Sequence, residues 1–129
     1  MSVTSVGGIT VNVAIASQIR GLLDAATAAG LNLRGGGYRS SAAQVATRRA
    51  NCGSSYYDIY QKPASQCSPP TAIPGRSMHE QGRAIDFTSG GALITSRSNP
   101  AFVWLSRNAS RFGMYNLPSE PWHWSTNGR

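Results

Sequence analysis

The residues of this chain that could do chemistry are gathered in two short segments, SMHEQGRAID at 77–86 and EPWHW at 120–124. Both histidines of the chain, His79 and His123, lie in them. Three of its five acidic residues lie there as well. Imidazole nitrogen and carboxylate oxygen are typical zinc ligands. We interpret the pattern as a zinc site with two histidines and one aspartate as ligands and a separate glutamate as base.

This set of side chains suits a hydrolytic zinc centre. Such a centre keeps three protein ligands and leaves the fourth position to water. His79, Asp86 and His123 would leave the ion with a net positive charge, which lowers the pKa of the bound water towards ~7. A carboxylate off the metal must then take the water's proton and pass it to the leaving amine. Glu120 stands three residues before His123, near enough to do so without being a ligand.

The spacing of the two segments limits the elements that can carry them. His79 and Asp86 are seven residues apart with Gly82 between them, and two turns of a continuous helix would hold them too far apart to share an ion. We therefore expect a loop that turns at Gly82 into a strand. Pro121 argues against a helix in the second segment. Residues 122–124 should form a strand with the tryptophans on one face and the imidazole on the other.

The combination Ser-x-His-x-x-Gly-x-Ala-x-Asp and Glu-x-Trp-His-Trp resembles the VanY-type D-alanyl-D-alanine carboxypeptidases, which belong to the LAS zinc metallopeptidases. An upstream Gly-Tyr-Arg-Ser at 37–40, followed by Gln44, matches a third motif of that family. The resemblance runs from about residue 31 to residue 124. It is specific through the two main motifs together, whereas the upstream motif alone would be weak.

The resemblance implies a role for each matching residue. It assigns one zinc ion to His79, Asp86 and His123, and the role of catalytic base to Glu120. Arg39 would bind substrate or stabilise the oxyanion. Ser77 and Gln44 would line the substrate pocket.

The function implied is zinc-dependent hydrolysis in peptidoglycan, with removal of the terminal D-Ala from stem peptides. The same zinc machinery could serve a lysin-type endopeptidase, which would need a cleft that is open at the far end. A non-catalytic wall-binding module on the same scaffold is the third possibility, and the presence of Glu120 argues against it.

The charge of the chain fits such a partner. Its net charge is +7, from 12 basic and 5 acidic residues. This is either an ordinary solvated surface or a means of attraction to an anionic polymer such as the bacterial wall. Nucleic acid is disfavoured, because the arginines are scattered and not interleaved with aromatic residues. We expect a monomer.

The cellular location follows from the substrate and not from a targeting signal. No apolar stretch approaches the ~18 residues of a transmembrane helix. No signal peptide is visible. We expect an extracytoplasmic protein, secreted or associated with the wall, or a part of a phage lysin or virion.

Cys52 and Cys67 are the only cysteines. A disulfide between them would close a loop of ~15 residues and contribute on the order of 3 kcal/mol. It would also indicate an oxidising compartment. The alternatives are a reduced pair or zinc ligation, although thiolate ligation lacks further cysteines. The loop itself, 51–76, should be irregular and form a lid or cleft wall. Its three tyrosines would build a small satellite core or contact substrate.

We expect a small α+β fold in which a central antiparallel sheet carries the metal on one face and two or three helices cover the other. A single domain should span 1–129, with residues 1–11 flexible or forming one short strand at 9–11. Apolar periodicity and terminal signals predict the remaining elements. These are helices at 13–29, 41–50 and 100–112, and strands at 31–34, 83–87, 114–117 and 122–124.

Overall fold

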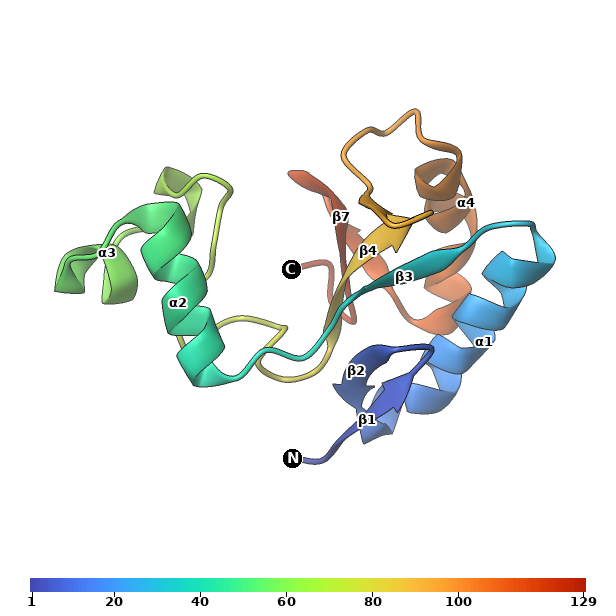
Figure 1. Cartoon of the computed structure of the whole chain (residues 1–129), viewed down its shortest axis with the longest axis horizontal. Helices are drawn as coiled ribbons and strands as arrows, with labels where there is room; N and C mark the ends of the chain where they lie inside the picture. The colour runs from blue at the N-terminus through green and yellow to red at the C-terminus, as the bar shows by residue number, and fades with distance from the viewer.

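The computed structural model describes all of residues 1–129. A five-stranded antiparallel sheet lies at the centre of the fold (Figure 1). Its strand order is β3-β4-β7-β6, with β5 paired to β4. The predicted α+β architecture is confirmed. The strands are β3 (Leu33–Gly36), β4 (Ala84–Ser89), β5 (Ala92–Leu93), β6 (Tyr115–Leu117) and β7 (Glu120–Ser125).

The two central strands alternate between core and site. On β4, Ile85 and Phe87 are fully buried in the hydrophobic core, whereas Asp86 between them points to the opposite face. The register pairs Ile85 with Trp124 and Asp86 with His123. Because paired residues share a face of the sheet, one register places both the core pair and the site pair.

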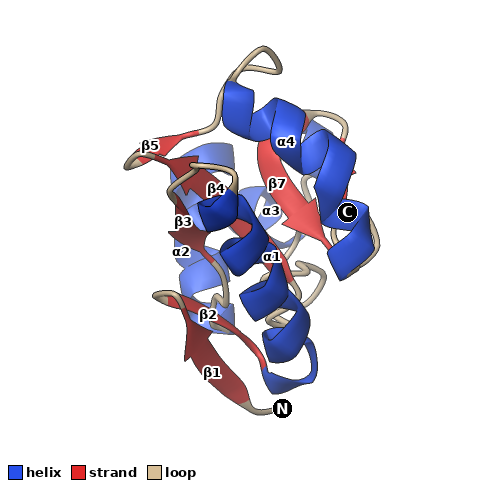
Figure 2. Cartoon of the chain, turned by 90° about the vertical axis from the view of Figure 1, so that its right-hand side faces the viewer, coloured by secondary structure: helices blue, strands red, loops and turns tan.

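Helices α1 (Ala16–Ala28) and α4 (Pro100–Asn108) cover the core face of the sheet (Figure 2). Short 3₁₀ turns, η1 (Val13–Ile15) and η3 (Ala109–Phe112), occupy the start and the end of the two predicted helices. The Asn99 side chain caps the start of α4 by accepting a hydrogen bond from the Ala101 amide. The helices all fall short of the length and hydrophobicity that a membrane span requires.

An N-terminal hairpin replaces the single strand that we expected at 9–11. Strands β1 (Val3–Val6) and β2 (Ile9–Asn12) pair antiparallel. Val6, Ile9 and Val11 on them are buried in the main core, so this segment is part of the packed fold.

The hairpin also supports the turn that carries His79. The Asn12 amide donates to the Gly82 carbonyl at 2.8 Å, and the Asn12 side chain donates to the Gln81 carbonyl at 3.1 Å. Gly82 has φ +66°, and a Cβ there would lie 2.7 Å from the Asn12 nitrogen. Only glycine meets both demands, which explains the residue at which the chain turns into β4.

The segment 51–76 is more regular than its composition predicts. Helix α2 (Ser41–Cys52) extends into it, and α3 (Tyr56–Tyr60) and the 3₁₀ turn η2 (Ala64–Gln66) follow. Ser55 and Asp58 form a capping box at the start of α3, a sequence signal that could have revealed this helix. Figure 1 shows α2 and α3 standing apart from α1 and α4, on the other side of the sheet.

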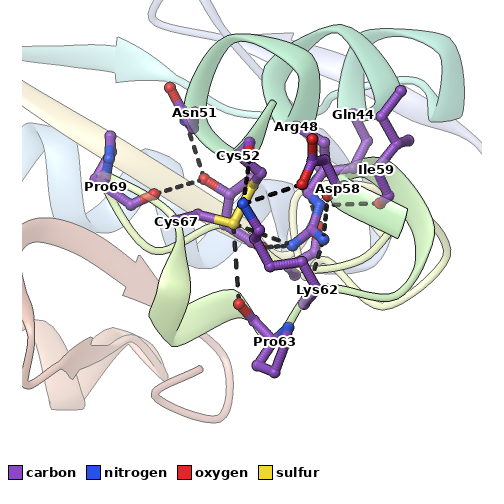
Figure 3. The surroundings of a disulfide bond; sticks show 12 residues. Gln44, Arg48, Asn51, Cys52, Asp58, Ile59, Lys62, Pro63, Cys67 and Pro69 are labelled. Carbon is purple, nitrogen blue, oxygen red and sulfur yellow. Dashed lines mark hydrogen bonds and ion pairs between the residues drawn. A yellow bond between two sulfur atoms is a disulfide. The ribbon is translucent and has the colours of Figure 1, made fainter. Parts of the chain in front are cut away.

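The predicted disulfide between Cys52 and Cys67 is present (Figure 3). Beside it Arg48 is fully buried, which corrects the view that the arginines lie on the surface. Its guanidinium donates to a set of loop carbonyls. These belong to Asp58 (2.6 Å), Ile59 (2.9 Å), Lys62 (2.7 Å) and Thr71 (2.6 Å).

The three tyrosines of this segment are exposed, so the expected tyrosine core is wrong. The buried residues beside α3 are instead Cys52, Ile59, Cys67 and Arg48. The tyrosines also do not line the cavity of the site, so nothing supports their contact with substrate. They are Tyr56, Tyr57 and Tyr60.

Candidate active site

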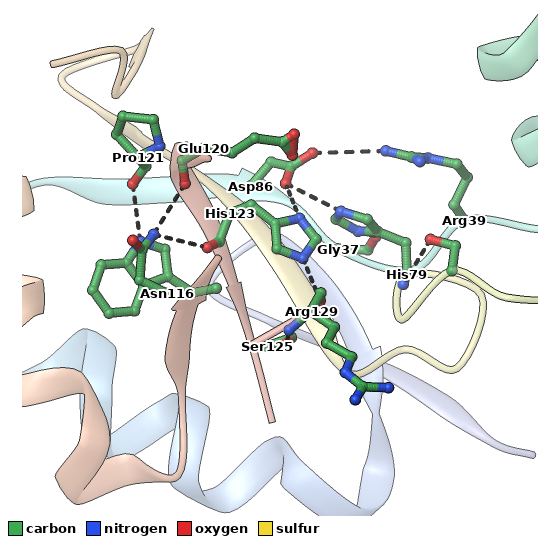
Figure 4. A network of polar contacts seen from close by, with 12 residues as sticks. Gly37, Arg39, His79, Asp86, Asn116, Glu120, Pro121, His123, Ser125 and Arg129 are labelled. Atoms are coloured by element: carbon green, nitrogen blue, oxygen red, sulfur yellow. Dashed lines mark hydrogen bonds and ion pairs between the residues drawn. The ribbon is translucent and has the colours of Figure 1, made fainter. Parts of the chain in front are cut away.

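The three predicted metal ligands converge at one point. Asp86 comes from β4, His123 from β7, and His79 from the turn that precedes β4. The Nε2 atom of His79 and the Nδ1 atom of His123 each lie 3.1 Å from the same oxygen, Oδ1 of Asp86 (Figure 4). Both imidazoles are buried.

A main-chain oxygen orients each imidazole. Nδ1 of His79 lies 2.8 Å from the Gly37 carbonyl oxygen, and Nε2 of His123 lies 2.7 Å from the Arg129 main-chain oxygen. A neutral imidazole that donates one N–H to a carbonyl keeps a lone pair on the other nitrogen. The lone pairs of His79 Nε2 and His123 Nδ1 then face the centre, as in metal sites where carbonyls hold the ligating histidines.

This donor set fits a divalent ion such as zinc. The two nitrogens and the carboxylate oxygen all lie within 4.8 Å of one another. A tetrahedral zinc ion with bonds of about 2.0–2.1 Å holds its ligand atoms about 3.3 Å apart. The 3.1 Å separations therefore need to open by only a few tenths of an ångström.

Electrostatics keep Asp86 ionised. Burial alone would raise its pKa, but hydrogen bonds and charges from His123 and His79 outweigh burial and hold the pKa below its usual range. Burial lowers the pKa of His123, and the Asp86 carboxylate and the Arg129 oxygen more than reverse this and raise it. The site thus presents an ionised carboxylate between two imidazoles, which suits the binding of a cation.

Glu120 shares the cavity but does not belong to the three-residue cluster. It is the first residue of β7 and only 6% exposed. Burial raises the pKa of its carboxyl above the ordinary value, although the positive charge of His123 works in the opposite direction. A carboxyl group whose pKa is raised holds a proton more readily than an ordinary one, as a group that takes up and then returns a proton requires.

Arg39 lies at the edge of the cluster. Its Nη2 is 3.6 Å from Oδ2 of Asp86, and its Nη1 donates to Oε1 of Gln44 at 2.8 Å. Gln44 is fully buried and donates in turn to the Ala72 carbonyl at 2.8 Å. The structure thus brings together the two residues of the upstream motif, although α2 carries one and the preceding loop the other.

Ser77 is buried at the start of the His79 turn, and its Oγ accepts from the His79 amide at 3.2 Å. The carboxylate of Glu80, a residue to which the sequence analysis assigns no role, fixes this turn. It accepts from the amides of Gly75 (2.9 Å) and Ser77 (3.2 Å) and from the hydroxyl of Ser41 (3.2 Å). The Ser-x-x-Glu spacing of a capping box was the signal that could have found it.

The side chains that the sequence assigns to the site line one cavity of about 420 Å³; they are those of Arg39, Gln44, Ser77, His79, Asp86, Glu120 and His123. The sheet and the His79 turn form one side, and the opposite side comes from α2 and from residues 64–72. The expectation that the 51–76 segment supplies a cleft wall is confirmed for this part of it. Trp122 both lines the cavity and packs against the core.

Comparison with known proteins gives one related curated sequence. It is a D-alanyl-D-alanine carboxypeptidase of Enterococcus faecalis (strain ATCC 700802 / V583), 28% identical over 131 residues. The match covers 91% of this chain and 48% of the relative, so the chain spans about half of the relative's length.

Two solved structures share the fold. VanYB in complex with D-Alanine-D-Alanine superposes with a TM-score of 0.74 at 26% identity, over 97% of this chain and 76% of that one. A mutant of the vancomycin resistance D,D-pentapeptidase VanY, from the VanB-type resistance cassette and in complex with Zn(II), superposes with a TM-score of 0.71 at 24% identity, over 97% of this chain and 78% of that one. The family model "VanY: D-alanyl-D-alanine carboxypeptidase" matches residues 8–129, and the chain therefore belongs to the VanY family.

Proposed function

We propose that the chain is a zinc-dependent peptidoglycan peptidase that removes the terminal D-Ala from stem peptides. The observation that carries this proposal is the convergence of His79, Asp86 and His123 beside the buried carboxyl of Glu120 in one cavity. The Zn(II) and D-Alanine-D-Alanine complexes of the two structural relatives support the choice of metal and substrate.

We assign the metal to His79 Nε2, His123 Nδ1 and the Asp86 carboxylate. A zinc ion held there supplies Lewis-acid chemistry for the scissile carbonyl and for the attacking water. The main-chain oxygens of Gly37 and Arg129 hold the two imidazoles in the ligating tautomer.

Glu120 is the general base in this proposal. Its carboxylate accepts a proton from the attacking water, becomes the neutral acid, and returns the proton to the departing D-Ala amine. Burial favours the neutral acid between these two events, because it raises the pKa of the group.

Arg39 acts on the substrate. Its guanidinium is placed to bind the terminal carboxylate or to stabilise negative charge on the tetrahedral intermediate. Gln44 fixes the guanidinium from behind, through the 2.8 Å hydrogen bond, and Ser77 lines the same cavity.

The anionic wall is the expected larger partner. Arg76 and Arg129 line the cavity and make no side-chain hydrogen bond or ion pair with the protein, so their charges are available to an acidic substrate. We further propose that the chain is one domain and works as a monomer outside the cytoplasm, in a secreted or wall-associated protein or within a phage lysin or virion protein.

Digestion of defined muropeptides tests the activity. Loss of one terminal alanine from a pentapeptide stem is the expected product, and cleavage within a cross-link would instead indicate an endopeptidase. Glu120→Gln should keep the metal and lose the activity. If purified protein loaded with zinc cleaves neither substrate, the proposal is wrong and a wall-binding role takes its place.

A further inference from the structure

The strand that carries Glu120 and His123 is irregular between them. On β6, Asn116 pairs with Trp124, yet the next residue, Leu117, pairs with Glu120. Residues 121–123 of β7 therefore have no partner on β6, and the ordinary ladder of hydrogen bonds is broken there. The irregular stretch lies between the proposed base at one end and a proposed ligand at the other.

The side chain of Asn116 spans this break. Its Nδ2 donates to the Glu120 carbonyl at 3.0 Å and to the His123 carbonyl at 3.1 Å (Figure 4). A primary amide has two N–H donors on one nitrogen, and here both are used. One side chain thus holds the two ends of the irregular stretch at a fixed separation.

The neighbouring groups leave Asn116 little freedom. Its Oδ1 accepts from Nη1 of Arg97 at 3.3 Å, so the oxygen side of the amide is occupied and the nitrogen side faces the two carbonyls. Arg97 also donates to the Pro118 carbonyl, within the turn that joins β6 to β7. The indole of Trp124 donates to the Pro121 carbonyl at 3.1 Å, which satisfies a third carbonyl of the irregular stretch.

We propose that Asn116 is a positioning residue of the active site, which sets the distance between Glu120 and His123 by clamping their two carbonyls. This inference rests on the proposed roles of those two residues. The clamp is needed because a proton acceptor displaced by about 1 Å can cost about 100-fold in rate. A regular strand would fix the spacing through its backbone, and here the side chain replaces it.

Asn116→Asp tests the clamp, because aspartate has the same shape and no N–H donor. We expect kcat at saturating zinc to fall between about 10-fold and 100-fold with KM changed less than about twofold. Zinc affinity, measured by chelator competition without substrate, should weaken about 10-fold, as when other groups that support metal ligands are removed. Asn116→Ala should act in the same direction.

Gln18→Ala is the matched control. Gln18 also donates from its side-chain amide to a distant main-chain oxygen, that of Phe112 at 2.9 Å, but away from the cavity. It should lower the melting temperature without changing kcat or zinc affinity. If Asn116→Asp fails to fold, Asn116→Ala, which has no side-chain donor, decides the question by the same two readouts.

The inference is overturned if a folded Asn116 variant keeps both kcat and zinc affinity, or if Gln18→Ala loses them equally. Glu120→Gln, assayed in parallel, separates this failure from that of the proposed function. An active Glu120→Gln enzyme would refute the proposed mechanism, whereas an inactive one beside fully active Asn116 variants would refute only the clamp.

Discussion

His79 and Gly37 are joined by a 2.8 Å contact between the imidazole Nδ1 and the carbonyl oxygen, across 42 positions of sequence. Through this contact a main-chain oxygen of the upstream motif meets one of the three proposed metal ligands. The position of Gly37 is itself fixed by β2, since a Cβ on it would lie 2.1 Å from the Thr10 carbonyl oxygen. The N-terminal hairpin therefore helps to set the orientation of the His79 imidazole, a proposed metal ligand.

Gly37→Ala should weaken zinc binding by about 10-fold to 100-fold, because the new methyl group must push the Gly37 carbonyl away from His79. Chelator competition measures the affinity. Gly36→Ala is the matched control, since a Cβ at Gly36 meets no atom within 4 Å. Equal zinc affinity of the two variants would show that the carbonyl does not orient the imidazole.

Glu120→Gln should lower kcat by about 10²-fold to 10⁴-fold, the usual contribution of a general base. It should also stabilise the metal-free protein at neutral pH. The pKa of Glu120 is raised in the folded state, so wild type loses stability as the pH rises from about 4.3, the ordinary pKa, through the folded value. Glutamine carries no charge and escapes this loss.

Melting temperatures of the metal-free proteins at pH 4 and pH 7 check the stability part. The variant should melt above wild type at pH 7, and the difference should shrink at pH 4, where most of the Glu120 carboxyl of wild type is protonated in both the folded and the unfolded state. Asp24→Asn serves as the control, because Asp24 makes only an exposed ion pair with Arg20. A variant that melts below wild type at pH 7 would contradict the burial argument.

Zinc affinity should fall as the pH falls, because a proton and the metal compete for His123. The Asp86 carboxylate and the Arg129 oxygen raise the pKa of His123 against the effect of burial, so this competition begins at a higher pH than for a free imidazole. Asp86 does not contribute to this proton competition between pH 5 and pH 8, because its pKa is lowered and the carboxylate stays ionised there. Dissociation constants between pH 5 and pH 8 measure the effect, and a pH-independent value would refute the ligand assignment.

The sequence allowed the convergence of His79, Asp86 and His123 to be predicted, because these residue types are scarce in the chain and lie in two short segments. Gly82 marks the turn into β4, and Pro121 argues against a helix around His123. Local rules therefore suffice to place Asp86 and His123 on strands and His79 on the turn before β4. Their shared face then follows from the two-residue period of a strand.

The supporting residues could not be predicted in the same way, because their partners are backbone atoms from distant loops. In the sequence, Asn116 cannot be distinguished from an ordinary strand residue, because its role depends on the irregular pairing of β6 and β7. Arg48 reads as a surface arginine, and only the fold of residues 58–71 supplies the carbonyls that make its burial favourable. No residue-type pattern encodes where such carbonyls will point.

Arg48→Met should destabilise the protein by about 2 kcal/mol, because buried carbonyls that now accept from the guanidinium lose their donor. It should also raise KM more than it lowers kcat. Arg48 binds the Thr71 carbonyl, and Thr71 lies in the cavity wall opposite the proposed ligands. A displaced wall should therefore weaken substrate binding more than it slows the chemical step.

Denaturant titration and steady-state kinetics on a pentapeptide stem measure the two effects. Arg49→Ala, at the exposed neighbouring position, should leave stability and KM unchanged. The double variant Cys52→Ser/Cys67→Ser should lose about 3 kcal/mol through the freed loop, with a smaller change in KM, since Arg48 still holds the wall. An Arg48→Met enzyme with a normal KM and a reduced kcat would place the influence of Arg48 on the metal cluster and contradict its assignment to the cavity wall.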